Sequence, residues 1–277
     1  MPVASLATGA DIYYELHGRG EPLVFIPATG FSGEVWKPFQ VPELSRSLNV
    51  IIHDPRGCGR SSRVAQPCTI GQMACDVVAL LDHLGLGSAH VLGHSMGGRI
   101  ALAMALNFPG RVKSLILAAS GSGPAARSGP DCVPGLPFFL VIELVERGFD
   151  ACIRHEICES DTYFTAGFRQ RYPDRVRAFY EVAWPTHAKL PDYLQLCIAR
   201  HNFEATHRLS TLRVPTLVVI GDADVVGSNH LTQSEVLADR IPGAQYKLVK
   251  GQSHGFFWEV PEETNAWILD WVKSHTK

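Results

Sequence analysis

Residues 89–98, Ala-His-Val-Leu-Gly-His-Ser-Met-Gly-Gly, form the stretch that decides the fold. A short apolar run at 89–93 leads into Gly93-His94-Ser95-Met96-Gly97, and a small, apolar segment with helical character follows at 97–107. Glycines on both sides of Ser95 permit a sharp turn between a strand and a helix, which pushes the serine hydroxyl out over the sheet edge. The N-terminus of that helix then faces the reacting centre and favours a developing oxyanion. The stretch predicts that Ser95 is a nucleophile.

Further apolar runs and helical patterns alternate on both sides of this stretch. The runs are short and rarely alternate with polar residues, which is typical of strands covered on both faces of a parallel sheet. Besides 89–93, they lie at 22–27, 50–53, 114–118 and 215–221, with a weaker one at 244–249. Helical spacing of apolar residues is found at 70–84, 97–107, 233–240 and 262–273. The alternation predicts an α/β fold with right-handed crossovers.

One long segment interrupts the alternation. Residues 121–137 are rich in Pro, Gly and Ser, as a linker would be. Residues 136–207 then have helical spacing and no convincing strand, and 208–214 lead back into the next apolar run. We therefore predict a core made of residues 1–129 and 208–277, with a helical cap at 130–207 over one end of the sheet.

The composition limits the class of protein. The 277 residues are 46% hydrophobic, with 25 Lys and Arg against 27 Asp and Glu and a net charge of −2. There is no basic excess for a nucleic acid, so the expected partner is a small-molecule substrate. The N-terminus has no basic start, and no stretch of about 18 apolar residues exists. We expect no secretory signal, no contact with a membrane and a cytoplasmic location.

The cysteines and glycines give no sign of a cofactor. Seven cysteines are scattered without a C-x-x-C pair, which predicts free thiols in a reducing compartment. The short Gly-x-Gly pairs do not form a dinucleotide fingerprint, and no set of metal ligands is visible. We expect neither a cofactor nor a metal, in a monomer or a homodimer.

A serine nucleophile needs a base, and the base needs a group that fixes its tautomer. His254 lies in Gly251-Gln-Ser-His254-Gly255, between the last apolar run and the final helical pattern. That loop falls at the same carboxyl edge of the sheet as Ser95. The acid is expected after the run at 215–221, where Asp222 and Asp224 are both candidates. We favour Asp224, which lies further into the loop, with Asp222 as the alternative.

From about residue 11 onward the chain resembles the α/β-hydrolase superfamily with a helical cap. Gly-His-Ser-Met-Gly-Gly at 93–98 is similar to the nucleophile elbow of its esterases, lactonases and carbon–carbon hydrolases. Asp54-Pro-Arg-Gly-Cys-Gly-Arg-Ser61 resembles the D-x-R-G-x-G-x-S loop of the family, and Gly221-x-x-Asp224 resembles its acid loop. The resemblance implies a mostly parallel, twisted sheet flanked by helices, and it supports Asp224 over Asp222.

The chain departs from that family after the first core strand. The family usually has His-Gly there, whereas this chain has Pro27-Ala28, followed by Thr29 and Gly30. By the resemblance, the oxyanion donors are the backbone N–H groups of Thr29 and Met96. Proline lacks an N–H, but it does not occupy the donor position, so the oxyanion hole can form. Enol-lactonases of aromatic catabolism also lack His-Gly here, which points toward lactones.

The side chains that shape a pocket are less clearly marked. Aromatic residues are the candidates for its lining, and plain core packing is the alternative for each of them. A group of basic cap residues could steer anionic substrates, although exposed helix faces explain them equally well. The pocket candidates are Phe31, Phe138, Phe139, Trp184 and Phe256. The basic cap residues are Arg154, His155, Arg169, Arg171, Arg175 and Arg177.

These features predict hydrolysis of a small carboxylic ester or lactone through an acyl-enzyme on Ser95. A carbon–carbon hydrolase of vinylogous diketones would use the same triad, and a cofactor-free perhydrolase could use the same scaffold. A small-molecule receptor built on this fold is the alternative outside enzymes, and fast steady turnover would exclude it.

Overall fold

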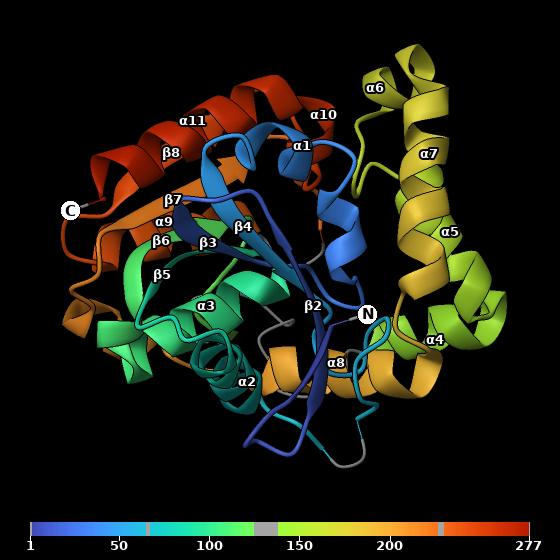
Figure 1. Cartoon of the computed structure of the whole chain (residues 1–277). Helices are drawn as coiled ribbons and strands as arrows, with labels where there is room; N and C mark the ends of the chain where they lie inside the picture. Colours follow the sequence, from blue (N-terminus) through green and yellow to red (C-terminus); the bar gives the residue numbers. More distant parts are fainter. Residues whose placement is uncertain (1, 65–66, 125–137, 227–229, 277) are drawn as a thin grey trace.

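The computed structural model describes residues 2–64, 67–124, 138–226 and 230–276 (Figure 1). An eight-stranded sheet in the order β1-β2-β4-β3-β5-β6-β7-β8 forms its centre. The strands are β1 (Val3–Ser5), β2 (Asp11–His17), β3 (Glu21–Ile26), β4 (Leu48–His53), β5 (Ala89–His94), β6 (Val112–Ala118), β7 (Thr216–Gly221) and β8 (Gln245–Val249).

The six apolar runs of the sequence are the six parallel strands β3 to β8, so the predicted fold class is confirmed. Every residue of β5 and β7 is buried, which explains their uninterrupted apolar character. β8 lies at an edge and is mostly exposed, and its signal is accordingly weak. The sequence did not predict β1 and β2, which pair antiparallel at the other edge.

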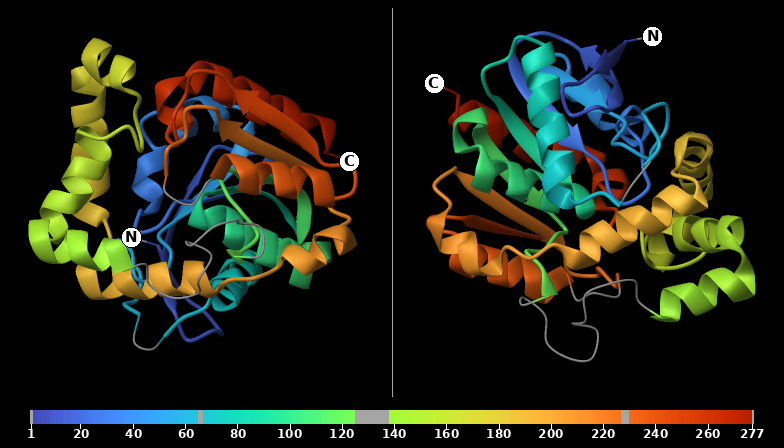
Figure 2. Two further views of the ribbon diagram at one scale, coloured as in Figure 1. Left: turned by 180° about the vertical axis from the view of Figure 1, so that it is seen from behind. Right: turned by 90° about the horizontal axis from the view of Figure 1, so that it is seen from below.

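Helices cover both faces of the sheet. α2 (Ile70–His83), α3 (Met96–Asn107) and α9 (His230–Arg240) lie on one face, while α1 (Gln40–Leu44) and α11 (Pro261–Ser274) lie together on the other (Figures 1 and 2). The chain enters α2 through a capping box, in which Thr69 and Gln72 each bond to the backbone of the other. Short connecting elements are η1 (Gly33–Trp36), η2 (Pro109–Arg111), η6 (Thr206–Thr211) and α10 (Phe256–Glu259).

Between β6 and β7, the described residues form helices and loops but no strand, and the helices from residue 138 to residue 202 lie within the interval predicted as a cap. They stand beside the core in Figure 1 and pack against loops at the carboxyl ends of the strands. Ala188 N–H, for example, donates to Gly30 O after β3 (2.8 Å). The helices are α4 (Phe138–Arg147), α5 (Phe149–Cys158), α6 (Ala166–Arg171), α7 (Pro173–Ala183), η5 (Trp184–Thr186) and α8 (Leu190–Asn202).

The Asp54 loop fixes the carboxyl end of β4. The buried Asp54 carboxylate accepts hydrogen bonds from Gly33 N–H (3.0 Å) and Arg60 N–H (2.9 Å). Arg56 donates two bonds of 2.6 Å to Asp76 on α2. These contacts give the motif at 54–61 a structural role beside the site.

Two further expectations concern the chemistry of the chain as a whole. Six of the seven cysteines are described, and all six are free thiols, while Cys132 lies outside the described residues. Within the described part of the chain, no helix has both the length and the apolar character needed to cross a membrane.

Candidate active site

Ser95 occupies a strained turn between β5 and α3. Its φ of 55° and ψ of −116° are uncommon for a residue with a side chain. Hydrogen bonds hold the turn from both sides. Ser95 N–H donates to Ala118 O (2.8 Å), and Ser95 O accepts from Gly98 N–H (3.0 Å) and Ser120 Oγ (2.7 Å). The surrounding backbone therefore keeps the serine at the tip of the turn.

The glycines beside Ser95 bring the turn against the end of β3. A Cβ on Gly97 would lie 2.1 Å from Ile26 O, and one on Gly93 would lie 2.2 Å from Gly97 O. Neither position has room for a side chain. This close approach sets the first turn of α3 beside the loop that carries Thr29.

The loop after β3 and the start of α3 offer two backbone donors. Phe31 N–H bonds to Ala28 O (3.1 Å), and Gly30 has a φ of 81°, which closes a tight turn around Thr29. Among the described contacts, neither Thr29 N–H nor Met96 N–H donates to a protein acceptor. Both residues are buried, so their N–H groups are available to an oxyanion in a dry environment.

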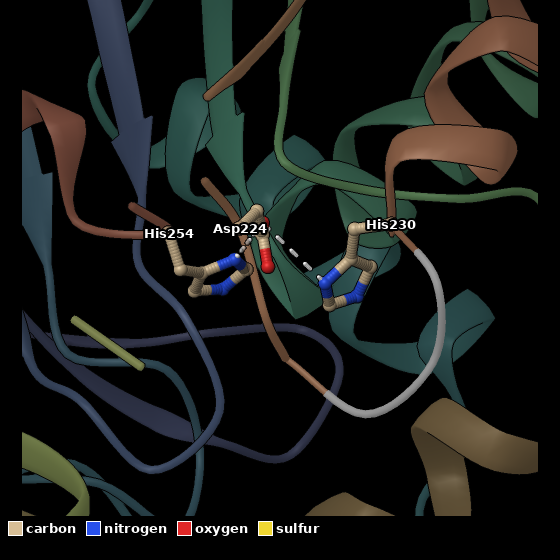
Figure 3. Close-up of side chains that lie close together, drawn as sticks. All are labelled: Asp224, His230 and His254. Carbon is tan, nitrogen blue, oxygen red and sulfur yellow. Dashed lines mark hydrogen bonds and ion pairs between the residues drawn. The ribbon is translucent and has the colours of Figure 1, made fainter. Parts of the chain in front are cut away.

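The predicted acid and base are hydrogen-bonded to each other. His254 Nδ1 lies 2.7 Å from Asp224 Oδ2 (Figure 3), and Asp224 Oδ1 accepts from Val226 N–H (2.9 Å). Burial alone would raise the pKa of Asp224, but the imidazoles of His254 and His230 hold that pKa well below its ordinary value. Asp224 is therefore ionised, and the bond assigns the proton to His254 Nδ1. Nε2 is left to accept a proton.

The alternative acid, Asp222, points elsewhere. Asp222 is exposed to solvent, and its Oδ1 accepts a hydrogen bond from Gly251 N–H (2.5 Å). The structure thus brings Asp224, and not Asp222, to the imidazole. Asp222 instead connects the acid loop to the loop that carries His254.

His94, the residue before Ser95, connects the nucleophile turn to the loop that carries His254. His94 Nε2 donates to His254 O (3.0 Å), and the two rings lie 4.7 Å apart. Within the described residues, Ser95 Oγ makes no hydrogen bond to His254. Such bonds commonly tighten only when substrate is bound. The resting site therefore aligns the acid with the base and anchors the base loop next to the nucleophile.

The model of the alpha/beta hydrolase fold family matches residues 21–261. The chain belongs to this family. A putative carbamate hydrolase RutD from Azorhizobium caulinodans is 30% identical to it over 94% of both chains. The enol-lactonase from Burkholderia xenovorans LB400 superposes with a TM-score of 0.81 at 25% identity, over 98% of this chain and 100% of that one. The solved structure of Est816, an N-acyl homoserine lactone degrading enzyme, gives a TM-score of 0.77 at 28% identity, over 96% and 98%.

These comparisons confirm the resemblance drawn from the sequence, and they identify the chain as a hydrolase. The family match spans the predicted nucleophile, acid and base together. The relatives differ from one another in the bond that their names describe.

A buried carboxylate joins the cap of the hydrolase to its base loop. Glu259 Oε1 accepts from Thr165 N–H (2.6 Å) and Thr165 Oγ (2.9 Å) at the start of α6. Glu259 Oε2 accepts from Ser253 N–H (2.7 Å) and Ser253 Oγ (2.9 Å), one residue before the base. In addition, His254 N–H donates to Thr162 O (3.2 Å). The base loop is thus braced by the cap.

Three polar residues of the hydrolase near this site were not predicted. Arg200, at the end of α8, donates from Nη1 to Thr29 Oγ1 (3.1 Å). Burial raises the pKa of Glu156 on α5, while the charges of Arg200 and His254 oppose that rise. His230 lies beside Asp224. In the sequence, Arg200 and Glu156 are indistinguishable from charges on solvated helix faces. The one signal for His230 is its place six residues after Asp224, at the start of a helix.

The described aromatic pocket candidates lie in different surroundings. Phe31 is buried at the junction of core and cap, with its ring 5.2 Å from Tyr163 and 5.9 Å from Phe179. Trp184 is partly exposed and stacks on other cap rings. Phe256 is fully buried in the core, 4.5 Å from the ring of Phe257. The side chains of Phe138 and Phe139 lie outside the described part of the chain.

Contacts in the cap favour structural roles for its arginines. Arg169 Nη1 donates to the carbonyls of Ser160 and Phe164, and Arg175 Nη2 donates to Trp258 O (3.1 Å). These guanidinium groups fasten loops instead of facing a substrate. Arg169 and Arg175, two of the six basic cap residues, therefore have structural roles.

Among the described residues, Asp224, His230 and His254 also place their ligand atoms within 4.8 Å of one another, as a metal site would. A divalent ion bound there would displace the proton that His254 Nδ1 donates to Asp224. The arrangement as it stands suits proton transfer.

Proposed function

We propose that this hydrolase cleaves small carboxylic esters or lactones through an acyl-enzyme on Ser95. The observation that carries the proposal is the 2.7 Å bond between His254 Nδ1 and the buried Asp224 carboxylate, set beside a serine in a strained turn. That bond gives the base its tautomer, and the turn sets the serine at the carboxyl edge of the sheet.

In the proposed reaction, Ser95 Oγ attacks the carbonyl carbon while His254 Nε2 takes its proton. Asp224 stabilises the imidazolium, and the N–H groups of Thr29 and Met96 bind the oxyanion. Each such donor contributes on the order of 3 kcal/mol to transition-state stabilisation. The imidazolium then protonates the leaving alcohol, and His254 activates a water that hydrolyses the acyl-enzyme.

Lactones are supported by two of the compared enzymes, whose names describe an enol-lactonase and an N-acyl homoserine lactone degrading enzyme. Pro27-Ala28 in place of His-Gly supports the same substrates. In a lactone the leaving alcohol stays attached to the acyl group, so the reaction needs no separate exit for it before deacylation.

A second candidate is hydrolysis of a carbamate. It is favoured by the relative that is 30% identical over 94% of the chain and is named as a putative carbamate hydrolase. A carbamate carbonyl would be attacked by the same serine and would place its oxyanion between the same two N–H groups.

A fluorophosphonate probe tests the proposal. We expect stoichiometric labelling of the wild-type protein by mass spectrometry, loss of labelling in Ser95→Ala, and full labelling in the matched control Ser122→Ala, another buried serine. No labelling of the wild type would refute the serine mechanism and favour the receptor alternative.

A substrate panel then separates the candidates. Values of kcat/KM should be highest for a short-chain ester or a lactone, and Ser95→Ala should abolish turnover. Preferred turnover of carbamates would establish the second candidate. Turnover of vinylogous diketones alone would establish the carbon–carbon hydrolase.

A further inference from the structure

Asp224 lies between two imidazoles, and only one of them belongs to the predicted triad. His254 Nδ1 is 2.7 Å from Asp224 Oδ2, and His230 Nδ1 is 3.7 Å from the same oxygen. The two rings have centroids 4.9 Å apart and planes inclined by 20°. Figure 3 shows both rings directed at the carboxylate, His254 from the base loop and His230 from the start of α9.

All three side chains are sealed from solvent. The exposed fraction is 0% for Asp224, 1% for His254 and 3% for His230. A buried carboxylate is strongly sensitive to each polar neighbour, because no water screens it. The second imidazole, at 3.7 Å, is one of the groups that lower the pKa of Asp224.

The rest of α9 holds His230 against the nucleophile helix. One turn after His230, Gln233 Oε1 accepts from Arg99 Nη2 on α3 (3.3 Å). Ser234 Oγ donates to Ser120 O (3.4 Å), and Ser120 in turn bonds to the turn at Ser95. The position of His230 is thus fixed relative to the reacting centre.

We propose that His230 is a positioning residue for the triad: as a neutral imidazole, it directs its Nδ1–H at Asp224 Oδ2 from 3.7 Å, beyond hydrogen-bond distance, and so shares that oxygen with His254 as a dipole and not as a hydrogen-bond donor. Val226 N–H fixes the other oxygen, so the carboxylate cannot rotate away from the base. Because Oδ2 faces two N–H dipoles, it holds the His254 imidazolium less tightly than an unshared carboxylate would. The base can then return its proton to the leaving group.

The surroundings of His230 keep it neutral. Burial lowers its pKa to about 4, Arg99 on α3 and His254 on the base loop act in the same direction, and Asp224 acts against them. His94 on β5 also interacts electrostatically with His230, and burial keeps the pKa of His94 well below its ordinary value. His230 therefore gains no charge over the range in which an ester hydrolase is assayed.

The test compares His230→Phe, which keeps a flat ring but has no donor, with His230→Gln, which keeps an N–H. The rate of Ser95 labelling and kcat/KM are measured from pH 5 to 9. In His230→Phe we expect about a five-fold loss of kcat with little change in KM. The acid limb of the pH profile of kcat/KM should move upward by about 0.5 pH unit, because Asp224 would hold the His254 imidazolium more tightly. His230→Gln should restore both values.

The low-field NMR signal of the His254 Nδ1 proton provides a readout independent of turnover. It should move further downfield in His230→Phe, because Oδ2 is no longer shared, and return in His230→Gln. His90→Phe is the matched control. His90 is also buried, burial lowers its pKa to about 4, and it bonds to Ser114, remote from the site. This control should change stability without changing either readout.

The proposal rests on the proposed triad, and the two can fail separately. If the wild type is labelled but His230→Phe keeps the wild-type acid limb and NMR signal, the role of His230 alone is overturned. Equal defects in His230→Phe and His230→Gln would reduce it to packing. Absence of labelling would refute the serine mechanism, while the NMR signal would still decide whether His230 shares Asp224.

Discussion

Replacing Asp224 by Asn should reverse the tautomer of His254. Asp224 Oδ1 accepts Val226 N–H at 2.9 Å, and the carbonyl oxygen of Asn would keep that bond. The amide NH₂ would then occupy the place of Oδ2, 2.7 Å from His254 Nδ1. Because a donor would face Nδ1, the imidazole would have to carry its proton on Nε2, where it cannot accept the proton of Ser95.

The size of the effect follows from this geometry. The carboxylate is fully buried, so no water can take over its role. Loss of the tautomer and of the charge that stabilises the imidazolium should lower kcat by about 10³–10⁴-fold, or roughly 4–5.5 kcal/mol of activation free energy. KM should change little, because Asp224 does not touch the substrate.

The assay is steady-state hydrolysis of the best substrate from the panel, together with the rate of fluorophosphonate labelling. Asp222→Asn is the matched control. Its amide oxygen can still accept from Gly251 N–H, so its kcat should stay within about two-fold of the wild type. The reasoning would be refuted if Asp224→Asn kept more than about a tenth of wild-type kcat, or if Asp222→Asn were the more impaired variant.

Three further predictions follow from other contacts. Gly97→Ala would place a Cβ 2.1 Å from Ile26 O, so labelling of Ser95 by the fluorophosphonate should slow by about 100-fold. The control Gly110→Ala, where a Cβ meets no atom within 4 Å, should be labelled at the wild-type rate, and equal labelling rates in the two variants would contradict the packing argument. Glu259→Gln places an NH₂ group against the N–H and hydroxyl donors of either Thr165 or Ser253, which should lower the free energy of unfolding by about 2–4 kcal/mol and Tm by roughly 5–10 °C. The control Glu263→Gln, at an exposed position, should have the Tm of the wild type, and an unchanged Tm in Glu259→Gln would count against the bridge. Burial lowers the pKa of four histidines from 6.5 to about 4, so the unfolded chain binds more protons than the folded chain between these two pH values. The free energy of unfolding is therefore highest above pH 6.5 and decreases as the pH falls toward 4. Tm should drop by at least about 5 °C between pH 7 and 4.5, and a constant Tm would show that these imidazoles take up protons as readily in the folded chain as in the unfolded one. The four are His53, His90, His187 and His230.

The sheet and the acid–base pair were predictable because local chemistry marks them. The strand runs are apolar since the sheet is covered on both faces, and the glycines around Ser95 are required by close backbone contacts. His254 and Asp224 follow strand ends, and parallel strands bring their carboxyl ends together. The order of elements alone therefore places these two side chains near the nucleophile.

What depends on packing between distant segments was not predictable. β2 has a mixed pattern of buried and exposed residues, so it lacks the signal of the central strands. Phe31 and Phe256 are equally apolar in sequence, yet one lies at the junction with the cap and the other in the core. Arg200 reaches Thr29 across 171 residues, a contact that no local pattern encodes.

The bridge through Glu259 limits how freely caps can be exchanged in this fold. The core supplies one carboxylate, and the cap must supply the backbone N–H and hydroxyl that Thr165 now presents to it. A chimera that carried a foreign cap without an equivalent donor pair would leave a buried negative charge half unpaired next to Ser253. The cap and the base loop must therefore be exchanged together. Recombination aimed at new specificity should place its crossover points outside both segments.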